Sequence, residues 1–557
     1  MTNLKISPNT PLETVWKGAG WFNAYFLTKF ALAHFGYLNL EPAYNALLFA
    51  AVVLPIGTRA LDIARNLAGA LAAAALLWHE SWLPGPEAIR ANAHNLTNFS
   101  SSFLFNFIVD AVNPVLVAWL AAGIVAWLFL RRWMRFSTLT VIGLVVTAFP
   151  QLVPWATPSE KEASAREIAA VPESAPAVRS ETAASPLRPP QPANGTGEDV
   201  ERWLTAFFSE EENRVANLPT KAIPETVSGS FDIAVVNICS LSNDDLAATG
   251  LDRHNVWSKF DVRFAGFSSA TSYSGPATLR LLTAACGQPP HSALYGERRP
   301  QCELLNRFAA AGWENRLYLD HNGRFDNYLA SLRELAGLTP ALNDLTKLHV
   351  RYEAFDGSPV YDDADVFNQW FSDLSSRPAS RTVSLFNLVA LHDGNRAPSS
   401  AKSFDYAPLA KSLLDDLEGI MDRIEKSGRP VLFIVVPEHG AAVRGDKIQM
   451  ARLREIPSPK ITNVPVLVKF FGLKIDGALR TIEAPTSYLA LAELMARTAT
   501  SGVYRDREAD ASAAVDEILM DLPQTWPVSQ NANASVVRFA GVHWVRLHAG
   551  KWIKYPE

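Results

Sequence analysis

Cysteine is scarce in this chain of 557 residues, which has only three, and there is no excess of positive charge. Lysine and arginine number 51 against 56 aspartates and glutamates, a formal net charge of -5. Nucleic-acid-binding domains usually carry a basic excess, so we expect no nucleic-acid partner. The N-terminus also lacks a basic region followed by a short apolar core and a small-residue cleavage site. We therefore expect no signal peptide to be removed.

Hydrophobic residues make up 48% of the chain, which at this length is enough for a large core and a membrane unit. The apolar stretches of the first 155 residues are Trp21–Leu40, Tyr44–Ile56, Leu67–Trp78, Val112–Leu130 and Leu139–Trp155. A membrane helix needs about 20 apolar residues, and the second and third stretches are short. Four or five spans are compatible with this pattern, and we predict an α-helical transmembrane bundle of five.

Arginines indicate how these spans are oriented, because cytoplasmic loops are enriched in positive charge. Arg59 and Arg65 would lie between spans two and three, and Arg131, Arg132 and Arg135 between spans four and five. An odd number of spans then places everything after Trp155 outside the cytoplasm.

Two charged side chains suggest contacts with lipid. Lys29 lies within the first apolar stretch, where it could contact a lipid headgroup or extend to the nearer membrane surface. Glu80 belongs to the segment His79–Asp110, which we predict to be an extracytoplasmic loop that helps to form an entry site for lipid.

The rest of the chain reads as a linker and a second domain. Residues 156–198 are rich in Pro, Ala, Ser and Glu and predict an extended linker between a transmembrane domain, 1–155, and a catalytic domain, 199–557. In that domain short apolar runs alternate with helical patterns at Tyr406–Lys426 and Thr486–Arg497. This alternation predicts an α/β fold with a mainly parallel sheet. The four runs are Phe231–Ile238, Val383–Leu388, Val431–Val436 and Val464–Phe471.

The three cysteines divide into a pair and a single thiol. Cys286 and Cys302 close a short loop in a domain expected outside the cytoplasm, so we predict a disulfide, worth about 3 kcal/mol for a loop of that size. Cys239 is left unpaired at the end of a predicted strand. It could be a buried core residue or a metal-bound thiolate.

Two further motifs favour the metal site. Glu438 and His439 follow the predicted strand Val431–Val436, and Gly440 would allow the backbone to turn so that both side chains reach one ion. A thiolate, a carboxylate and an imidazole suit Zn²⁺. Ser274 could occupy the remaining position as a nucleophile, because coordination lowers the pKa of a hydroxyl.

These motifs carry a family resemblance. Val235–Leu241, Ala270–Pro276 and Pro437–Gly440 resemble, in order, the first metal motif, the nucleophile motif and the Asp-His-Gly motif of the alkaline phosphatase and sulfatase superfamily, with Cys239 and Glu438 replacing its acids. A membrane unit followed by such a domain resembles the membrane phosphoethanolamine transferases. The resemblance is strongest to the bacterial cellulose phosphoethanolamine transferases, through these segments and Phe355–Asp363, Leu391–Asn395 and Ile456–Pro459.

The resemblance implies an alkaline-phosphatase-like catalytic domain in the periplasm, anchored by several spans in the bacterial inner membrane. It implies transfer of phosphoethanolamine from phosphatidylethanolamine to glucose 6-hydroxyls of cellulose, with contacts to cellulose synthase subunits. Carried over position by position, zinc would be held by Cys239, Ser274, Glu438 and His439. His392 would bind the phosphoryl group or relay a proton.

Three other residues are candidates for substrate binding, each with a structural alternative. Tyr273 could contact the phosphoryl oxygens or the ethanolamine, or pack as an ordinary aromatic. Arg454 could bind phosphate in a bidentate manner or form a surface salt bridge. His321 could line the pocket, although His321-Asn-Gly323 also suits a capped turn.

Two other classes of function remain open. A hydrolase would use the same residues with water as the acceptor, but the final arginine of a sulfatase motif is missing from Ser274–Thr278. A scaffold subunit of a polysaccharide synthase would need no chemistry at all.

Overall fold

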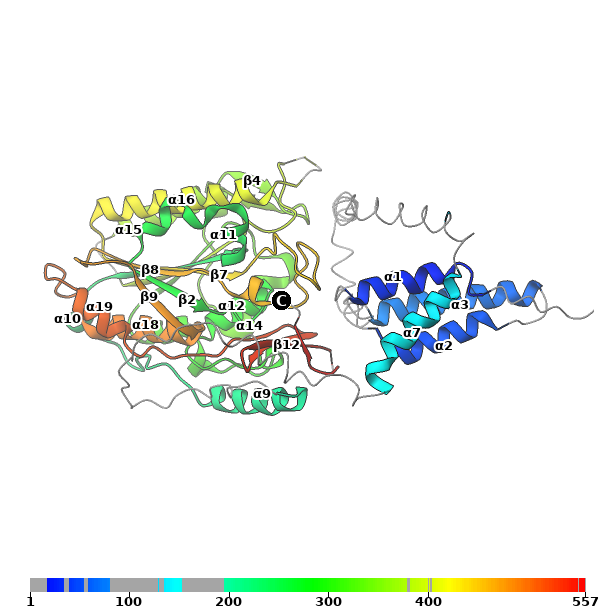
Figure 1. Ribbon diagram of the computed structural model, residues 1–557. Coiled ribbons are helices and arrows are strands. Elements are labelled where there is room, and N and C mark those ends of the chain that lie inside the picture. The colour runs from blue at the N-terminus through cyan, green and yellow to red at the C-terminus, as the bar shows by residue number, and fades with distance from the viewer. Residues whose placement is uncertain are drawn as a thin grey trace, which may run out of the picture. The chain divides into compact units, whose positions relative to one another are not determined.

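The computed structural model describes residues 18–34, 40–54, 59–80, 129, 135–152, 195–377, 381–398, 400, 403–548 and 550–555. The chain divides into two compact units (Figure 1). Described residues up to Leu152 belong to the first unit and those from Gly195 onward to the second. Residues 153–194, which hold the predicted domain boundary and most of the predicted linker, lie outside the described part. The domain bounds therefore stay predictions.

The described part of the first unit consists of helices α1 (Phe22–His34), α2 (Pro42–Val53), α3 (Arg59–Glu80) and α7 (Phe136–Leu152). Of these, only α3 holds a segment long and apolar enough to cross a membrane, Ala60–Glu80. Shorter apolar segments occur at Pro42–Val53 and Phe136–Thr147. The five-span bundle is not confirmed, and the predicted fourth span lies outside the described residues except for Phe129.

Side-chain contacts and helix bounds in the first unit correct three predictions. Lys29 is buried and paired with Glu80, and it also donates to Asn45 Oδ1 at 2.7 Å. Because its side chain is buried, Lys29 neither contacts lipid headgroups nor extends to a membrane surface. Its charge is paired inside the unit with the carboxylate of Glu80. Glu80 ends α3 instead of lying in a loop. Arg59 and Arg65 lie on the first turns of α3, not in a connection between helices.

The second unit is built on a seven-stranded sheet, which confirms the predicted α/β class. The strand β8 is antiparallel to both neighbours and all other neighbouring pairs are parallel. Strands β1 and β7 are buried along their whole length, as expected of strands covered on both faces. In order the strands are β3 (Glu314–Leu319), β6 (Thr382–Leu388), β1 (Asp232–Cys239), β7 (Val431–His439), β8 (Val466–Phe471), β2 (Val262–Phe267) and β9 (Arg480–Thr486).

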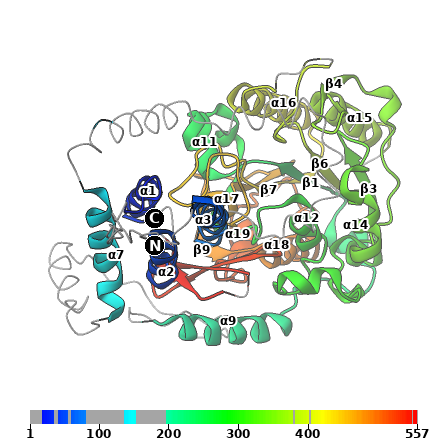
Figure 2. The same cartoon turned by 90° about the vertical axis from the view of Figure 1, so that its right-hand side faces the viewer.

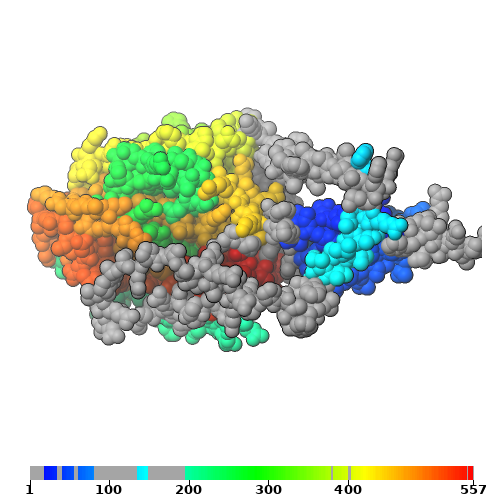
Figure 3. Space-filling view, viewed as in Figure 1, coloured from blue at the N-terminus to red at the C-terminus, as the bar shows by residue number. Residues whose placement is uncertain are grey.

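Helices cover both faces of this sheet (Figure 2), and each face has its own apolar core. The longest of these helices is α16 (Tyr406–Ser427), which the sequence predicted at Tyr406–Lys426. The space-filling view shows it at the surface beside α11 (Figure 3). One face packs α10 (Glu225–Ser228), α12 (Ser274–Leu282), α13 (Leu304–Ala310), α14 (Tyr328–Ala336), α18 (Tyr488–Ser501) and α19 (Ser512–Leu519). The other packs α11 (Asn243–Thr249), α15 (Asp363–Ser375) and α16 (Tyr406–Ser427).

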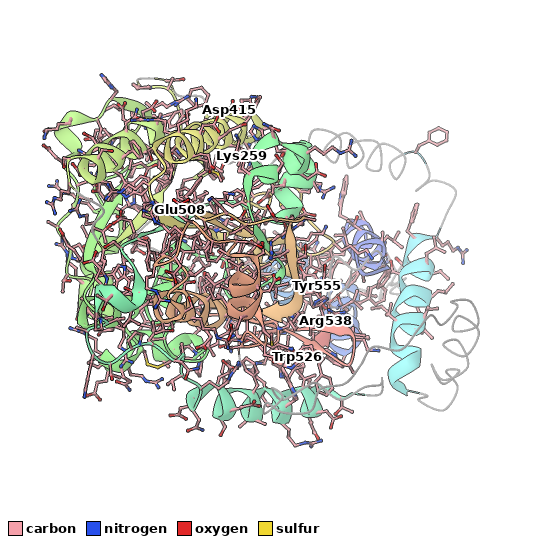
Figure 4. The ribbon with its side chains drawn as sticks, turned by 90° about the vertical axis from the view of Figure 1, so that its left-hand side faces the viewer. Lys259, Asp415, Glu508, Trp526, Arg538 and Tyr555 are labelled. Carbon is pink, nitrogen blue, oxygen red and sulfur yellow. A yellow bond between two sulfur atoms is a disulfide. The ribbon has the colours of Figure 1, made fainter. Side chains whose placement is uncertain are left out.

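A small antiparallel sheet completes the unit: β10 (Val528–Gln530), β11 (Ala534–Phe539), β12 (Val542–Leu547) and β13 (Ile553–Lys554). Helix α9 (Gly197–Glu212) packs Trp203 and Phe207 against it. Trp526, Arg538 and Tyr555 gather around this sheet (Figure 4). The remaining elements are the hairpin β4 (Val350–Glu353) and β5 (Pro359–Tyr361), α17 (Pro459–Thr462), and the 3-10 helices η1 (Leu251–Arg253), η2 (Asn255–Lys259), η3 (His291–Tyr295), η4 (Pro300–Cys302), η5 (Phe325–Asn327) and η6 (Leu345–Lys347).

The cysteines pair as predicted. A disulfide joins Cys286, which follows α12, to Cys302 at the end of η4, and Cys239 is a buried free cysteine.

Candidate metal centre

Cys239 and His439 meet at one edge of the sheet because they end two neighbouring parallel strands. Cys239 is the last residue of β1, His439 is the last of β7, and the two are paired in the ladder. The distance from Cys239 Sγ to His439 Nε2 is 3.9 Å. The carboxyl ends of parallel strands are where α/β folds place their ligands.

A β-bulge brings Glu438 to the same place. Ile238 pairs with Pro437 but Cys239 pairs with His439, so Glu438 is the extra residue of β7. A bulge breaks the alternation that would otherwise send adjacent side chains to opposite faces. The sequence predicted that the strand would end before Glu438, but β7 runs through His439.

Gly440 has a different role from the predicted one. It is not among the glycines with positive φ, so the backbone there needs no left-handed conformation. A Cβ at this position would lie 2.5 Å from Ser242 Oγ and 2.8 Å from Asp245 Oδ2. Glycine is required because the end of β7 passes close to the first turn of α11.

Ser274 is the first residue of α12, and it lies between the two strand ends. Its Oγ is 3.1 Å from Cys239 Sγ and 3.3 Å from His439 Nε2. The N-terminus of a helix favours negative charge, whether on the serine oxygen or on a bound anion. The four residues predicted to hold the metal therefore come together.

The cluster suits a metal ion chemically. Ligand atoms of Cys239, Glu438 and His439 all lie within 4.8 Å of one another, and all three residues are buried. Glu438 Oε1 accepts hydrogen bonds, whereas Oε2 is buried, has no hydrogen-bond partner in the described part of the chain and lies 3.9 Å from His439 Nε2. Sulfur, carboxylate oxygen and imidazole nitrogen are donors that Zn²⁺ prefers.

The protonation states point in the same direction. Burial, and then the negative charge of Glu438, raise the pKa of Cys239 to about 12, so the thiol needs a nearby cation to ionise at neutral pH. Burial, and then the positive charge of Arg454, lower the pKa of His439 well below its ordinary range. Nδ1 of this neutral imidazole lies 2.9 Å from the Gly440 carbonyl, which places the ring proton on Nδ1. The lone pair of Nε2 is then available to bind a metal.

Sequence reasoning missed the groups that hold Glu438. Its Oε1 accepts from Asn387 Nδ2 at 2.6 Å and from Thr278 Oγ1 at 2.9 Å, and the second N–H of Asn387 donates to Asn237 Oδ1 at 3.1 Å. Asn237 and Asn387 are polar residues inside the apolar strands β1 and β6, and Thr278 follows Ser274 by one helical turn. Buried amides in such strands were the available signal.

His321 lies behind this group and was predicted to bind substrate. Nδ1 accepts the Gly323 N–H at 3.1 Å, and Nε2–H donates to Asn387 Oδ1 at 3.0 Å, so both ring nitrogens are engaged. Burial lowers the pKa of His321 to about 4, which keeps the ring neutral. The contact with Gly323 matches the alternative interpretation, a capped turn.

Arg454 and Tyr273 border the cluster. Arg454 Nη1 donates to Ser240 Oγ at 3.1 Å and lies 3.4 Å from His439 Nδ1, so the guanidinium is at the site and not in a surface salt bridge. The Tyr273 side chain is 37% exposed, and its hydroxyl donates to Glu455 Oε1 at 2.8 Å. Part of Tyr273 therefore remains accessible to a ligand.

His392 stacks on Phe355, with ring centroids 5.0 Å apart, and its Nδ1 lies 2.8 Å from the carbonyl of Asp393. Burial, and then Arg454, lower the pKa of His392 to about 4. The ring is therefore a neutral base at physiological pH. No hydrogen bond joins it to Ser274 among the described residues.

The fold and the cluster together define an α/β domain with a candidate metal-assisted group-transfer or hydrolytic site. The chain belongs to the family of the cellulose biosynthesis protein BcsG: residues 186–552 match the C-terminal domain of that family and residues 21–149 its N-terminal domain. It is 39% identical to cellulose biosynthesis protein BcsG of Salmonella typhimurium (strain LT2) over 98% of both chains. It is 38% identical to that of Escherichia coli (strain K12) over 97% of both.

Solved structures show weaker likenesses. A protein in the alkaline phosphatase superfamily from Vibrio parahaemolyticus has a TM-score of 0.45 at 14% identity, covering 62% of this chain and 85% of that chain. The C-terminal periplasmic domain of EcEptC from Escherichia coli has a TM-score of 0.41 at 13% identity, covering 57% and 93%. Neither likeness is strong enough to carry a conclusion about function.

Proposed function

We propose that this chain transfers phosphoethanolamine from phosphatidylethanolamine to glucose 6-hydroxyls of cellulose, through a covalent intermediate on Ser274. The observation that carries the proposal is the position of Ser274 Oγ, at the N-terminus of α12 and within 3.3 Å of both Cys239 and His439. Membership of a cellulose biosynthesis family supports the acceptor. The motif resemblance supports the lipid donor, the location at the inner membrane with the catalytic unit in the periplasm, and contacts with synthase subunits.

Cys239, Glu438 and His439 would hold Zn²⁺, with Ser274 at the fourth position. A zinc ion there would supply positive charge that lowers the pKa of the serine hydroxyl and polarises a phosphoryl oxygen. Asn387 and Thr278 hold Glu438 Oε1, which leaves Oε2 available for the ion.

In the first step Ser274 Oγ attacks phosphorus and the bond from phosphorus to the diacylglycerol oxygen breaks. The serine proton leaves with diacylglycerol, so the products are neutral diacylglycerol and a phosphoethanolamine ester of Ser274. The N-terminus of α12 and the nearby guanidinium of Arg454 stabilise the phosphoryl oxygens. The partly exposed ring of Tyr273 is placed to contact the ethanolamine.

In the second step the 6-hydroxyl of a glucose unit attacks the same phosphorus and the bond to Ser274 Oγ breaks. Neutral His392 is suited to accept the hydroxyl proton, a role worth typically about 10²–10⁴-fold in rate. The proton then returns to Ser274. Two half-reactions that share one covalent intermediate predict ping-pong kinetics.

Mass spectrometry of the full-length chain tests this proposal. After incubation with phosphatidylethanolamine vesicles, peptide mapping should find phosphoethanolamine on Ser274, and a soluble cello-oligosaccharide should then remove it. Ser274→Ala should form no adduct, whereas Ser258→Ala, at an exposed serine of η2, should behave as wild type.

Other outcomes separate the remaining classes. Release of free phosphoethanolamine without transfer to the glucan would identify a hydrolase. No adduct and no product from a chain that binds zinc would favour a scaffold subunit.

A further inference from the structure

A second polar cluster lies beneath α12, around the buried side chain of Arg280. Arg280 is 3% exposed, and Nη1 donates to the Pro289 carbonyl at 2.8 Å. Its Nε and Nη2 are buried and have no hydrogen-bond partner among the described residues. Burial lowers the pKa of Arg280 only to about 10, so the guanidinium remains charged at neutral pH.

The positive charge of Arg280 is not balanced by a carboxylate. Among the described residues no acidic group forms an ion pair with it. Glu211 approaches the same loop from α9, but it is paired with Arg214, and its Oε2 accepts the Gln288 N–H at 2.7 Å. An isolated buried charge is costly, so a compensating negative group is expected nearby.

A cavity of about 10 Å³, enough for one water-sized molecule, adjoins this guanidinium. None of the ten described residues that line the cavity is acidic. Besides Arg280, three of them carry buried side-chain atoms without hydrogen-bond partners: Tyr488 Oη, Thr525 Oγ1 and Gln288 Oε1. The two hydroxyls can donate to an acceptor inside the cavity.

The cavity also lies at the start of α18, a helix of 14 residues. Ser487, Tyr488 and Leu489 line it, and no side chain caps this end of the helix. The first N–H groups of a helix have no partner within the helix, and together with the helix dipole they favour an anion.

We propose that this cavity binds one halide-sized monovalent anion, naturally chloride, between the guanidinium of Arg280 and the N-terminus of α18. The anion would join α12, which carries Ser274, to the loop Gly287–Pro289 and to α18. None of Cys239, Ser274, Glu438 and His439 lines the cavity, and the proposal does not depend on the reaction catalysed at the metal cluster.

Thermal unfolding of the full-length chain in detergent tests this site. Sodium chloride should replace sodium gluconate at constant ionic strength, so that the screening of surface charges is unchanged. An anion that binds only the folded state raises the folded-to-unfolded ratio about 11-fold at ten times its dissociation constant. Bromide should act like chloride, and sulfate should not, because it is too large for the cavity.

Variants locate the effect. Arg280→Gln and Thr525→Val should each weaken or remove the chloride dependence, because they remove the charge and one donor. Arg263→Gln removes an equal charge from an exposed position on β2 and should keep the wild-type dependence. If Arg280→Gln does not fold, Thr525→Val and the wild-type measurements still decide whether chloride binds in this cavity.

Crystals of the wild-type chain grown in bromide give a direct answer. An anomalous peak beside Arg280 would support the site. A water molecule there, or stability that is the same in chloride and gluconate, would overturn it.

Discussion

The protonation of Cys239 sets the first expectation at the scale of single residues. The thiol is fully buried next to Glu438, and its pKa of about 12 means that only a cation can make it a thiolate at neutral pH. A neutral hydroxyl is a poorer zinc ligand than a thiolate. Cys239→Ser should therefore purify with less than a tenth of the wild-type zinc, measured by elemental analysis. Full zinc with full turnover would make Cys239 an ordinary core cysteine.

His321 is predicted to position Glu438 through Asn387. Loss of a direct hydrogen-bonding partner of a metal ligand typically costs about 10–100-fold in metal affinity, and His321 acts one bond further out, through Asn387. We therefore expect His321→Ala to lose zinc to a chelator at concentrations up to about 10-fold below those needed for wild type. His349→Ala removes an exposed histidine paired with Asp365 and should not change chelation. Unchanged zinc affinity in His321→Ala would limit His321 to capping its turn.

Asp320 and Asp363 form a buried pair that predicts a pH dependence of stability. Burial raises the pKa of Asp320 to about 8, and burial, with the neighbouring charge of Asp320, raises the pKa of Asp363 well above its ordinary value. Both folded carboxyls thus keep protons that the unfolded chain releases near pH 4. The free energy of unfolding should fall by about 1.4 kcal/mol per pH unit for each proton kept, between roughly pH 4 and 8.

Asp363→Asn should make this dependence shallower, because it removes one of the two titrating carboxyls. Urea unfolding of both chains from pH 5 to 8.5 measures the two slopes. Equal slopes would show that Asp363 does not contribute.

At the scale of elements, the small C-terminal sheet supports the edge of the site. Asn531, in the turn after β10, accepts the Ser272 N–H at 3.2 Å and donates to the Glu455 carbonyl at 3.0 Å. Tyr555, after β13, donates to Asp446 Oδ2 at 2.5 Å in the segment that follows β7. These bonds connect the loops of Ser274 and Arg454 to one support.

We expect Asn531→Ala to lower stability by about 2 kcal/mol, since several buried partners lose their bonds. Turnover should fall about tenfold or more, because the loops on both sides of the phosphoryl site loosen. The melting temperature and initial rates of transfer test this, with Asn533→Ala in the same turn as the matched control. Wild-type kinetics in a destabilised Asn531→Ala chain would show that the small sheet stabilises the fold without affecting the site.

At the scale of the whole molecule, the proposed function predicts the orientation of the chain in the membrane. The proposed lipid donor and polysaccharide acceptor require the second unit to lie outside the cytoplasm. A C-terminal alkaline phosphatase fusion should be active and a C-terminal green fluorescent protein fusion dark, because each reporter matures on one side only. The reverse pattern would contradict both the predicted topology and the proposed acceptor.

The sequence alone determined features that depend on neighbouring residues. Continuous apolar runs predicted β1, β6, β7 and β8, and the helical pattern predicted α16 and α18. Cys239 and Glu438-His439 could be chosen because they stand at or directly after the end of a predicted strand, and Ser274 because Ala270–Pro276 resembles a nucleophile motif. Local spacing also predicted the pairing of Cys286 with Cys302.

Only the tertiary structure decided how these parts meet. It made β8 antiparallel, paired Lys29 with Glu80 and turned His321 toward Asn387. It also placed Ser274 Oγ 3.3 Å from His439 Nε2 across 165 residues of sequence, with a bulge at Glu438 to aim the carboxylate. The physical reason is that strand register, bulges and buried polar partners depend on contacts between distant segments, which no local pattern of residues specifies.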